Sequence, residues 1–213
     1  MLKQYLDESK IEVGIDEAGR GCLFGPVCVG AVIWPHEDPP HEDPLHNCMP
    51  SPEIKDSKKV SEKKRLLLKD YIEEHAIAWS VQFISHEVID KINILKATMK
   101  GMHLCIDDIR KQLEIDTILV DGDKFDIYLN EDFDYVNHEC IIKGDNTYKS
   151  IAAASILAKT HRDNYIYDLV KQNPELEKYA LHKNKGYGTK IHMGALQKYG
   201  PTEGHRLSFK PCY

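Results

Sequence analysis

The chain has 213 residues, of which 42% are hydrophobic, and a formal net charge of −6. This length and composition exclude a disordered chain and predict one substantial core, or one domain with a small appendage. The sequence has neither a long apolar run nor the apolar centre of a signal peptide, so we predict a cytoplasmic protein without membrane segments. The six cysteines show no C-x-x-C spacing and no paired pattern, which favours reduced thiols over disulfides or a zinc site.

Two strands open the chain, over residues 11–17 and 26–34, and the glycine-rich turn between them predicts a β-hairpin. Residues 35–52 contain near-duplicate His-Glu-Asp-Pro units whose prolines exclude regular structure. A solvated surface loop is favoured there, and a metal site of histidines and carboxylates is the alternative. A helix that begins after Ser61 as its N-cap and a strand over residues 76–85 follow.

The second half of the chain alternates helices and strands. Apolar side chains recur at intervals of four and three from 95 to 113, which predicts a helix whose methionines lie in the core. Short strands over residues 116–122 and 135–145 follow, and each ends at an acid next to a glycine. The long helix predicted over 150–172 is rich in alanine and serine at its start, which would let it approach a sheet closely. A last helix is expected from about Thr189 to Tyr199.

This order of elements predicts an α/β protein with a mixed central sheet, because the first two strands form an antiparallel hairpin. No long internal repeat and no convincing linker precede about residue 172.

Acidic side chains interrupt apolar strands or follow their ends. Four of them do so: Asp16, Glu17, Asp121 and Asp145. One such acid alone is more often a cap, a turn residue or a salt-bridge partner, but four at strand ends favour convergence at one site. The cluster would repel itself unless cations neutralise it, and oxygen ligands suit Mg²⁺ or Mn²⁺. Two such ions can activate a water and stabilise a leaving oxygen, so the pattern predicts phosphodiester hydrolysis.

Asp16 and Glu17 pose a geometric question, because adjacent residues of a strand face opposite sides. Both can reach one ion only if the strand bends or ends there. Gly19 and Gly21 could provide that break.

Basic residues concentrate near the C-terminus, where residues 178–213 contain seven lysines or arginines and one acid, Glu203. This predicts a locally basic face suited to a phosphate backbone. A second basic cluster over residues 55–65 is more typical of a solvated helix face. Tyr187 lies between two glycines, so its ring either packs under a loop or is exposed to stack on a base or sugar.

Five segments together resemble the type 2 ribonucleases H, and ribonuclease HII among them. They are "GIDEAGRGCLFGPVCVGAVI", "DSKKVSEKKR", "ILVDG", "KGDNTYKSIAAASILAKTHRD" and "GYGTKIHMGALQKYGPTEGHRLSF". The resemblance covers about residues 11–209. It implies a ribonuclease H-like catalytic domain over residues 1–172 and a C-terminal helical extension over residues 173–213 that contributes to substrate binding. It also implies an endonuclease that cleaves the RNA strand of RNA–DNA hybrids and nicks DNA duplexes containing ribonucleotides. The products would carry 3′-hydroxyl and 5′-phosphate ends, and the protein would act as a monomer with two Mg²⁺ or Mn²⁺ ions.

The resemblance also implies roles for single residues. The four acids named above match the catalytic and metal-binding carboxylates of the family, whereas Asp163 is expected to be structural. Gly19, Arg20 and Gly21 match a turn whose backbone reads the 2′-hydroxyl, the group that separates RNA from DNA. Tyr187 matches a tyrosine that stacks on the deoxyribose after the ribonucleotide. The loop over residues 36–46 is longer and more acidic than the family's usual connection there.

Two other classes remain as alternatives. A phosphoacceptor receiver domain also combines acids from two strands, but here Asp121 follows Asp16 at a separation too large for that small fold. A nucleic-acid-binding module without catalysis would bind a hybrid and leave it intact in Mg²⁺ or Mn²⁺.

Overall fold

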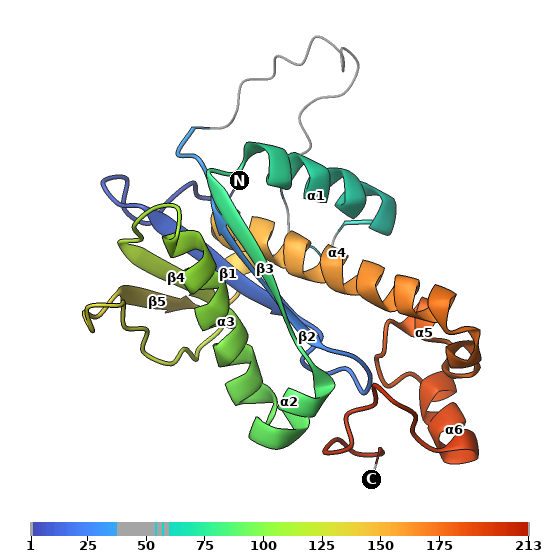
Figure 1. The fold of residues 1–213 in the computed structure, drawn as a ribbon. Coiled ribbons are helices and arrows are strands. Elements are labelled where there is room, and N and C mark those ends of the chain that lie inside the picture. Colours follow the sequence, from blue (N-terminus) through green and yellow to red (C-terminus); the bar gives the residue numbers. More distant parts are fainter. Residues whose placement is uncertain (1, 38–53, 55–56, 58–59, 213) are drawn as a thin grey trace, which may run out of the picture.

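The computed structural model describes residues 2–37, 54, 57 and 60–212 (Figure 1). Five strands form one sheet: β1 (Glu12–Ala18), β2 (Val27–Ile33), β3 (Ala78–Ile84), β4 (Thr117–Asp121) and β5 (Asn137–Ile141). Their order is β3-β2-β1-β4-β5. β1 pairs antiparallel with β2, and β2 with β3, whereas β4 runs parallel to both β1 and β5. The predicted hairpin and the mixed sheet are therefore confirmed.

Helices cover both faces of this sheet. On one face, α3 (Ile94–Arg110) packs its methionines and isoleucines on alternate residues of the strands, including Val13, Ile15 and Val29. On the other face, α4 (Lys149–Gln172) crosses β1 and β2, and α1 (Glu62–His75) packs on α4. The methionines of α3 are buried, as predicted, because they lie on its sheet-facing side.

The approach of α4 to the sheet depends on two glycines. A Cβ added to Gly14 of β1 would lie 2.3 Å from the backbone of Ser150, and one added to Gly30 of β2 would lie 2.5 Å from the carbonyl of Ala154. Such distances leave no room for any side chain. The small residues at the start of α4 and these two glycines therefore set the spacing between helix and sheet, as the alanine-rich pattern predicted.

Replacing Gly30 with alanine should therefore push α4 away from the sheet. We expect the free energy of unfolding to fall by about 1–3 kcal/mol, the usual cost of overpacking a core. Urea denaturation measures this loss. Gly194→Ala is the control, since its added methyl group meets nothing within 4 Å and its helical position favours alanine over glycine by about 1 kcal/mol. Equal stability of the two variants would contradict the proposed close contact.

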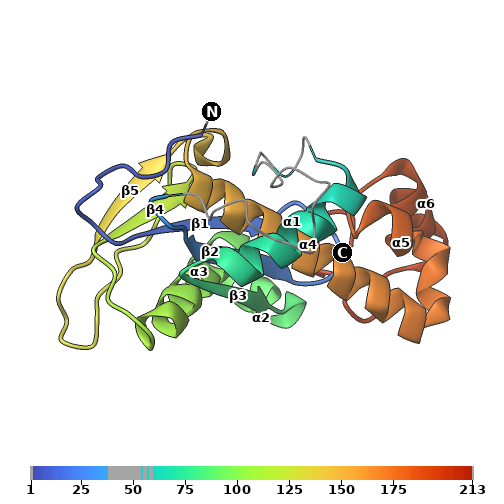
Figure 2. The ribbon, with the colours of Figure 1, turned by 90° about the horizontal axis from the view of Figure 1, so that it is seen from above.

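The chain after α4 forms a compact helical unit at one end of the molecule. Its elements are η3 (Pro174–Tyr179), α5 (Leu181–Asn184) and α6 (Lys190–Tyr199). Figure 2 shows α5 and α6 gathered at the end opposite β4 and β5. This unit shares a hydrophobic cluster with Leu23, Phe24 and Ile166. The division at residues 172 and 173 coincides with the end of α4 and stays a prediction.

Some details differ from the expected elements. The helix α2 (His86–Ile92) was not predicted, since its seven residues show too little periodicity, and Asn93 at positive φ separates it from α3. β5 is shorter than the strand expected over 135–145, because the chain turns after Ile141. No helix of the described residues is long and apolar enough to span a membrane.

Several sequence predictions fall outside or partly outside the described residues. Most of the His-Glu-Asp-Pro segment, over 38–53, is among them, and so are Lys55, Lys58 and Lys59 of the first basic cluster. Among the described cysteines, all five are free thiols.

Candidate active site

Strand register brings two of the predicted acids together. In the parallel pairing of β1 with β4, Ile15 lies opposite Val120. The next residue on each strand is an acid, Asp16 or Asp121. Because side chains alternate along a strand, both acids point to the face that α4 covers, opposite to the face of Ile15 and Val120 in the α3 core. Two carboxylates are therefore side by side at the carboxyl ends of adjacent parallel strands.

The turn η2 (Gly144–Asn146) brings Asp145 to the same edge of the sheet. The backbone N–H of Gly144 donates to Asp121 Oδ1 at 2.7 Å, which ties this turn to the end of β4. Asp145 is 3% exposed, and its Oδ1 accepts from Asn146 Nδ2 at 2.9 Å. Asp145 therefore directly follows Gly144, the residue that binds Asp121.

Glu17 does not point to the same side of the sheet as Asp16 and Asp121. The pairing of β1 with β2 continues regularly through Glu17 and Ala18, and the break comes only at Gly19, where φ is +93°. By alternation, Glu17 belongs to the side of the strand opposite Asp16. Arg20 Nη1 donates to Glu17 Oε1 at 3.0 Å, so this acid is linked to the turn that follows it. The predicted break exists but does not separate the two acids.

The electrostatics of the site centre on Asp16, which is 5% exposed. Burial raises its pKa well above the usual value, and the negative charges of Glu17 and Asp121 raise it further. Hydrogen bonds from Ser155 and from the backbone N–H of Glu17, at 2.6 Å, act in the opposite direction. An ionised Asp16 is thus costly in the isolated protein.

Divalent cations fit the chemistry of these donors. The acids offer only oxygen ligands, and a cation between Asp16 and Asp121 would remove the repulsion that raises the pKa of Asp16. Within the described residues, however, no three histidine, cysteine or acidic side chains already stand at metal-binding spacing. The fit therefore rests on the donor type and on the repulsion between the acids, and binding would require their side chains to converge.

A second part of the site surrounds the segment that follows the glycine-arginine-glycine turn. Two C-terminal segments flank it: Leu23 N–H donates to the Gly186 carbonyl at 2.8 Å, and Gly25 N–H donates to the Gly204 carbonyl at 2.8 Å. Cys22 forms a β-bridge with Tyr187. Motifs that are more than 160 residues apart in the sequence are therefore adjacent in the fold.

Tyr187 is 39% exposed at this junction. Lys159 Nζ lies 5.3 Å from the centre of its ring, and the Arg162 guanidinium lies 5.9 Å from it. Partial burial and the neighbouring Cys22 raise the pKa of Tyr187 to about 12, so the phenol is neutral near pH 7. The ring is half packed and half open, a combination of the two alternatives that its sequence left open.

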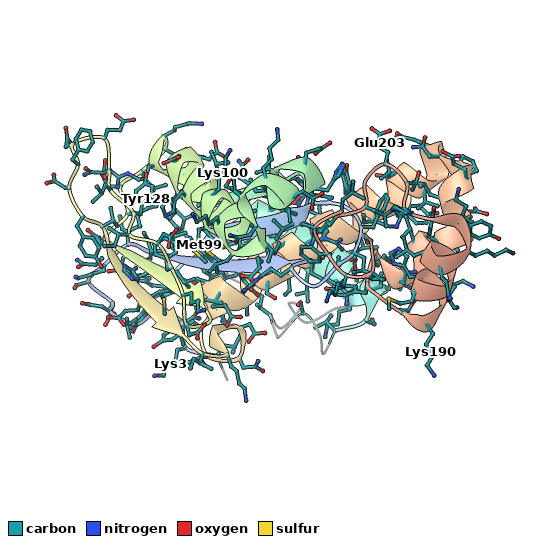
Figure 3. All side chains as sticks on the ribbon, turned by 90° about the horizontal axis from the view of Figure 1, so that it is seen from below. Lys3, Met99, Lys100, Tyr128, Lys190 and Glu203 are labelled. Atoms are coloured by element: carbon teal, nitrogen blue, oxygen red, sulfur yellow. The ribbon has the colours of Figure 1, made fainter. Side chains whose placement is uncertain are left out.

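Of the seven basic residues predicted to form a C-terminal face, five lysines are exposed, and their binding of a phosphate backbone stays a prediction. Lys185 is partly buried and lies 3.5 Å from Glu62. The exposed lysines are Lys178, Lys183, Lys190, Lys198 and Lys210. Figure 3 shows Lys190 pointing away from the molecule. Arg206, by contrast, is wholly buried, and its Nε and Nη1 donate to the carbonyls of Gly25 and Arg20 at 2.9 Å. It therefore supports the turn of Gly19, Arg20 and Gly21 from within and does not belong to a solvated surface.

Sequence reasoning missed two residues of α4 that link the parts of this site. Ser155 contacts Asp16, and Lys159, one helical turn later, lies next to Tyr187. Their spacing of four is a signal that could have identified them once α4 was placed over β1. Lys159 Nζ also pairs with Asp163 at 2.8 Å, and Arg65 approaches the same acid at 3.5 Å. Asp163 is thus neutralised in an ion-pair cluster, which agrees with the structural role expected for it.

Known proteins resemble this chain along nearly its whole length. The family model described as Ribonuclease HII matches residues 13–212. A ribonuclease HII of Parabacteroides distasonis is 46% identical over 98% of this chain and 94% of its own, and one of Cytophaga hutchinsonii is 44% identical over 98% and 93%.

Solved structures share the fold. The ribonuclease H2 of Pyrococcus horikoshii OT3 superimposes with a TM-score of 0.69 at 20% identity, covering 94% of each chain. A Bst-RNase HIII structure in complex with Mn²⁺ gives a TM-score of 0.69 at 18% identity, over 94% of this chain and 67% of that one. These likenesses confirm the predicted ribonuclease H-like architecture.

Proposed function

Because this chain belongs to the ribonuclease HII family and is therefore a ribonuclease H endonuclease, we propose that it acts on two kinds of duplex. It hydrolyses the RNA strand of RNA–DNA hybrids, and it nicks on the 5′ side of ribonucleotides embedded in duplex DNA. The products carry 3′-hydroxyl and 5′-phosphate ends. The observation that carries this proposal is the register of β1 and β4, which places Asp16 beside Asp121.

Asp16, Glu17, Asp121 and Asp145 would hold two Mg²⁺ or Mn²⁺ ions. Glu17 would have to turn its side chain toward the other three, because it starts from the opposite side of β1. When bound, such ions supply an activated water and stabilise the leaving oxygen of an in-line displacement. Burial raises the pKa of Asp16 most, and the negative charges of Glu17 and Asp121 raise it further. This repulsion supports the assignment, since cations would offset it. The likeness to a solved ribonuclease HIII in complex with Mn²⁺ supports the choice of metal.

Substrate selection would come from the turn of Gly19, Arg20 and Gly21 and from Tyr187. Glycines let backbone groups approach a sugar closely enough to test for its 2′-hydroxyl. Arg206 supports this turn through the Arg20 carbonyl, and Arg20 contacts Glu17. Recognition and catalysis would thus share the end of β1. We further propose that the protein acts as a cytoplasmic monomer.

Product mapping on one DNA duplex with a single ribonucleotide tests the proposed function. We expect one nick on the 5′ side of the ribonucleotide in Mg²⁺ or Mn²⁺, and none with EDTA. The same duplex without the ribonucleotide is the control. Binding without a nick in either metal would instead indicate a nucleic-acid-binding module.

Tyr187→Ala should weaken cleavage at single ribonucleotides, because the stacking surface for the following deoxyribose is lost. We expect a loss of about 10-fold in kcat/KM, since aromatic stacking contributes about 1–3 kcal/mol. Tyr199→Ala is the matched control, being an exposed tyrosine of the same extension. Unchanged rates in Tyr187→Ala would show that this ring only packs against its neighbours.

A further inference from the structure

Two histidines of the C-terminal extension are buried next to the substrate-facing elements and have no part in the proposed chemistry. His192 lies in α6 and His205 precedes Arg206; their exposed fractions are 0% and 1%. Their Nε2 atoms are 3.1 Å apart. Tyr179 and Phe24 pack edge-on against the ring of His205, with centroid distances of 4.8 and 5.0 Å. Such burial of two imidazoles in direct contact calls for a defined protonation state.

The contacts of His192 determine which of its nitrogens carries hydrogen. Its Nδ1 lies 3.0 Å from the carbonyl of Tyr187. A carbonyl can only accept, so Nδ1 must be the donor. Burial lowers the pKa of His192, which favours the neutral ring with a single N–H. Nε2 of His192 is therefore an acceptor.

The protonation of His205 follows from that of its partner. Its Nε2 must donate to His192, which leaves Nδ1 of the neutral ring as an acceptor. The backbone N–H of Thr202 supplies the matching donor, 3.0 Å from this Nδ1. The carbonyl of Thr202 also lies 3.1 Å from Nδ1, but it already accepts from the backbone N–H of His205. A hydrogen on Nδ1 of the neutral ring would leave both facing Nε2 atoms without hydrogen. Burial lowers the pKa of His205 to about 4, in agreement with a neutral ring. The hydrogen bonds therefore run in one direction, from Thr202 through His205 and His192 to the carbonyl of Tyr187.

The end of this chain of bonds is the backbone of the proposed stacking residue. Tyr187 is flanked by Gly186, whose φ is +85°, and by Gly188, so its neighbours do little to restrict the peptide. Its carbonyl accepts from the N–H of Thr189 at 2.8 Å as well as from His192. The histidine is the one side chain that fixes this carbonyl among the described contacts.

We propose that His192 and His205 are positioning residues that orient Tyr187 for contact with the substrate. His192 holds the Tyr187 carbonyl through Nδ1, and His205 fixes the ring of His192 through Nε2. The inference rests on the proposed function, because the contact of Tyr187 with the sugar is part of it. A role in packing alone would require only rings of the same size and not this sequence of donors and acceptors.

Two variants of His192 separate positioning from packing. In His192→Asn, the amide nitrogen takes the place of Nδ1 and can still donate to the Tyr187 carbonyl. In His192→Gln, the amide takes the place of Nε2 and keeps the contact with His205 instead. The measured quantity is the ratio of nicking at a single ribonucleotide to cleavage of an RNA–DNA hybrid. In the first substrate a deoxyribose follows the ribonucleotide at the cut, whereas in the hybrid another ribose does.

We expect His192→Gln to lower this ratio by about tenfold, the effect of one lost hydrogen bond, and His192→Asn by less than about threefold. Thermal unfolding of both variants checks that each is folded. In a Tyr187→Ala background, His192→Gln should lower the ratio no further, because its effect passes through Tyr187. Equal ratios for the two variants, or an additive loss in the double variant, would overturn the proposal.

Nitrogen-15 NMR of the imidazoles gives a readout that does not depend on cleavage. We expect hydrogen on Nδ1 of His192 and on Nε2 of His205, and a shift of the Tyr187 ring signals in His192→Gln but not in His192→Asn. The opposite tautomers would overturn the proposed chain of bonds. If the unaltered protein cleaves neither duplex while these NMR results hold, the proposed function fails and the orientation of Tyr187 by the histidines stands.

Discussion

Asp121→Asn is expected to reduce cleavage of a duplex carrying one ribonucleotide by about a thousandfold or more. The variant removes a negative charge from the pair formed with Asp16, and metal-ion catalysis contributes several kcal/mol through such ligands. The fold should survive, because the asparagine Oδ1 can still accept from Gly144 N–H, the bond that Asp121 makes at 2.7 Å. The loss should therefore appear in the rate and not in the unfolding transition.

Asp123→Asn provides a matched control for this experiment. Asp123 is an exposed acid only two residues further along the chain, beyond the end of β4. Its replacement changes the net charge of the protein by the same amount, and we expect rates within about twofold, as for most surface substitutions. Full activity of Asp121→Asn would remove Asp121 from the active site and, with it, the assignment based on strand register.

The strands that carry the acids could be predicted because local patterns are strong there. Thr117–Asp121 is a short run of mostly β-branched residues that ends at an acid, and Gly122 after it marks a turn. That Asp16 and Asp121 lie side by side could not be derived in detail from the sequence. Their proximity depends on the pairing of β1 with β4, whose paired residues are more than 100 positions apart. Register is a long-range property that a single strand does not contain.

Arg206 shows why charge counting was less reliable than strand patterns. Nothing in its neighbourhood in the sequence distinguishes it from the lysines of the C-terminal face. Its burial arises because the carbonyls of Arg20 and Gly25, far away in the sequence, need donors inside the fold. His192 and His205 could not be singled out from the sequence for the same reason. Their contacts form only when the C-terminal extension packs on residues 22–25.

Arg162→Met is expected to cause the largest loss of stability. Arg162 is fully buried in α4, and its guanidinium donates to three backbone carbonyls, those of Phe24, Pro26 and Lys185, at 2.8–3.0 Å. Methionine has a similar length but no donor, so all three carbonyls would lose the guanidinium, and that of Lys185 would keep a weak contact with the Cys22 thiol at 3.7 Å. Each unsatisfied buried acceptor costs about 1–3 kcal/mol, so we expect the free energy of unfolding to fall by about 3–5 kcal/mol.

Urea denaturation of the purified variants measures this loss, with Arg110→Met as the control. Arg110 pairs with the exposed Glu114 on the surface of α3, and such pairs contribute about 0–1 kcal/mol. Arg162→Lys should lie between the two, because one ammonium keeps the charge but cannot reach three carbonyls. If Arg162→Met unfolds like the control, the guanidinium does not hold residues 24–26 to the loop that contains Lys185. If the expected loss is found, Arg162 joins the catalytic sheet to the extension that carries Tyr187, since its three bonds lie on both sides of that junction.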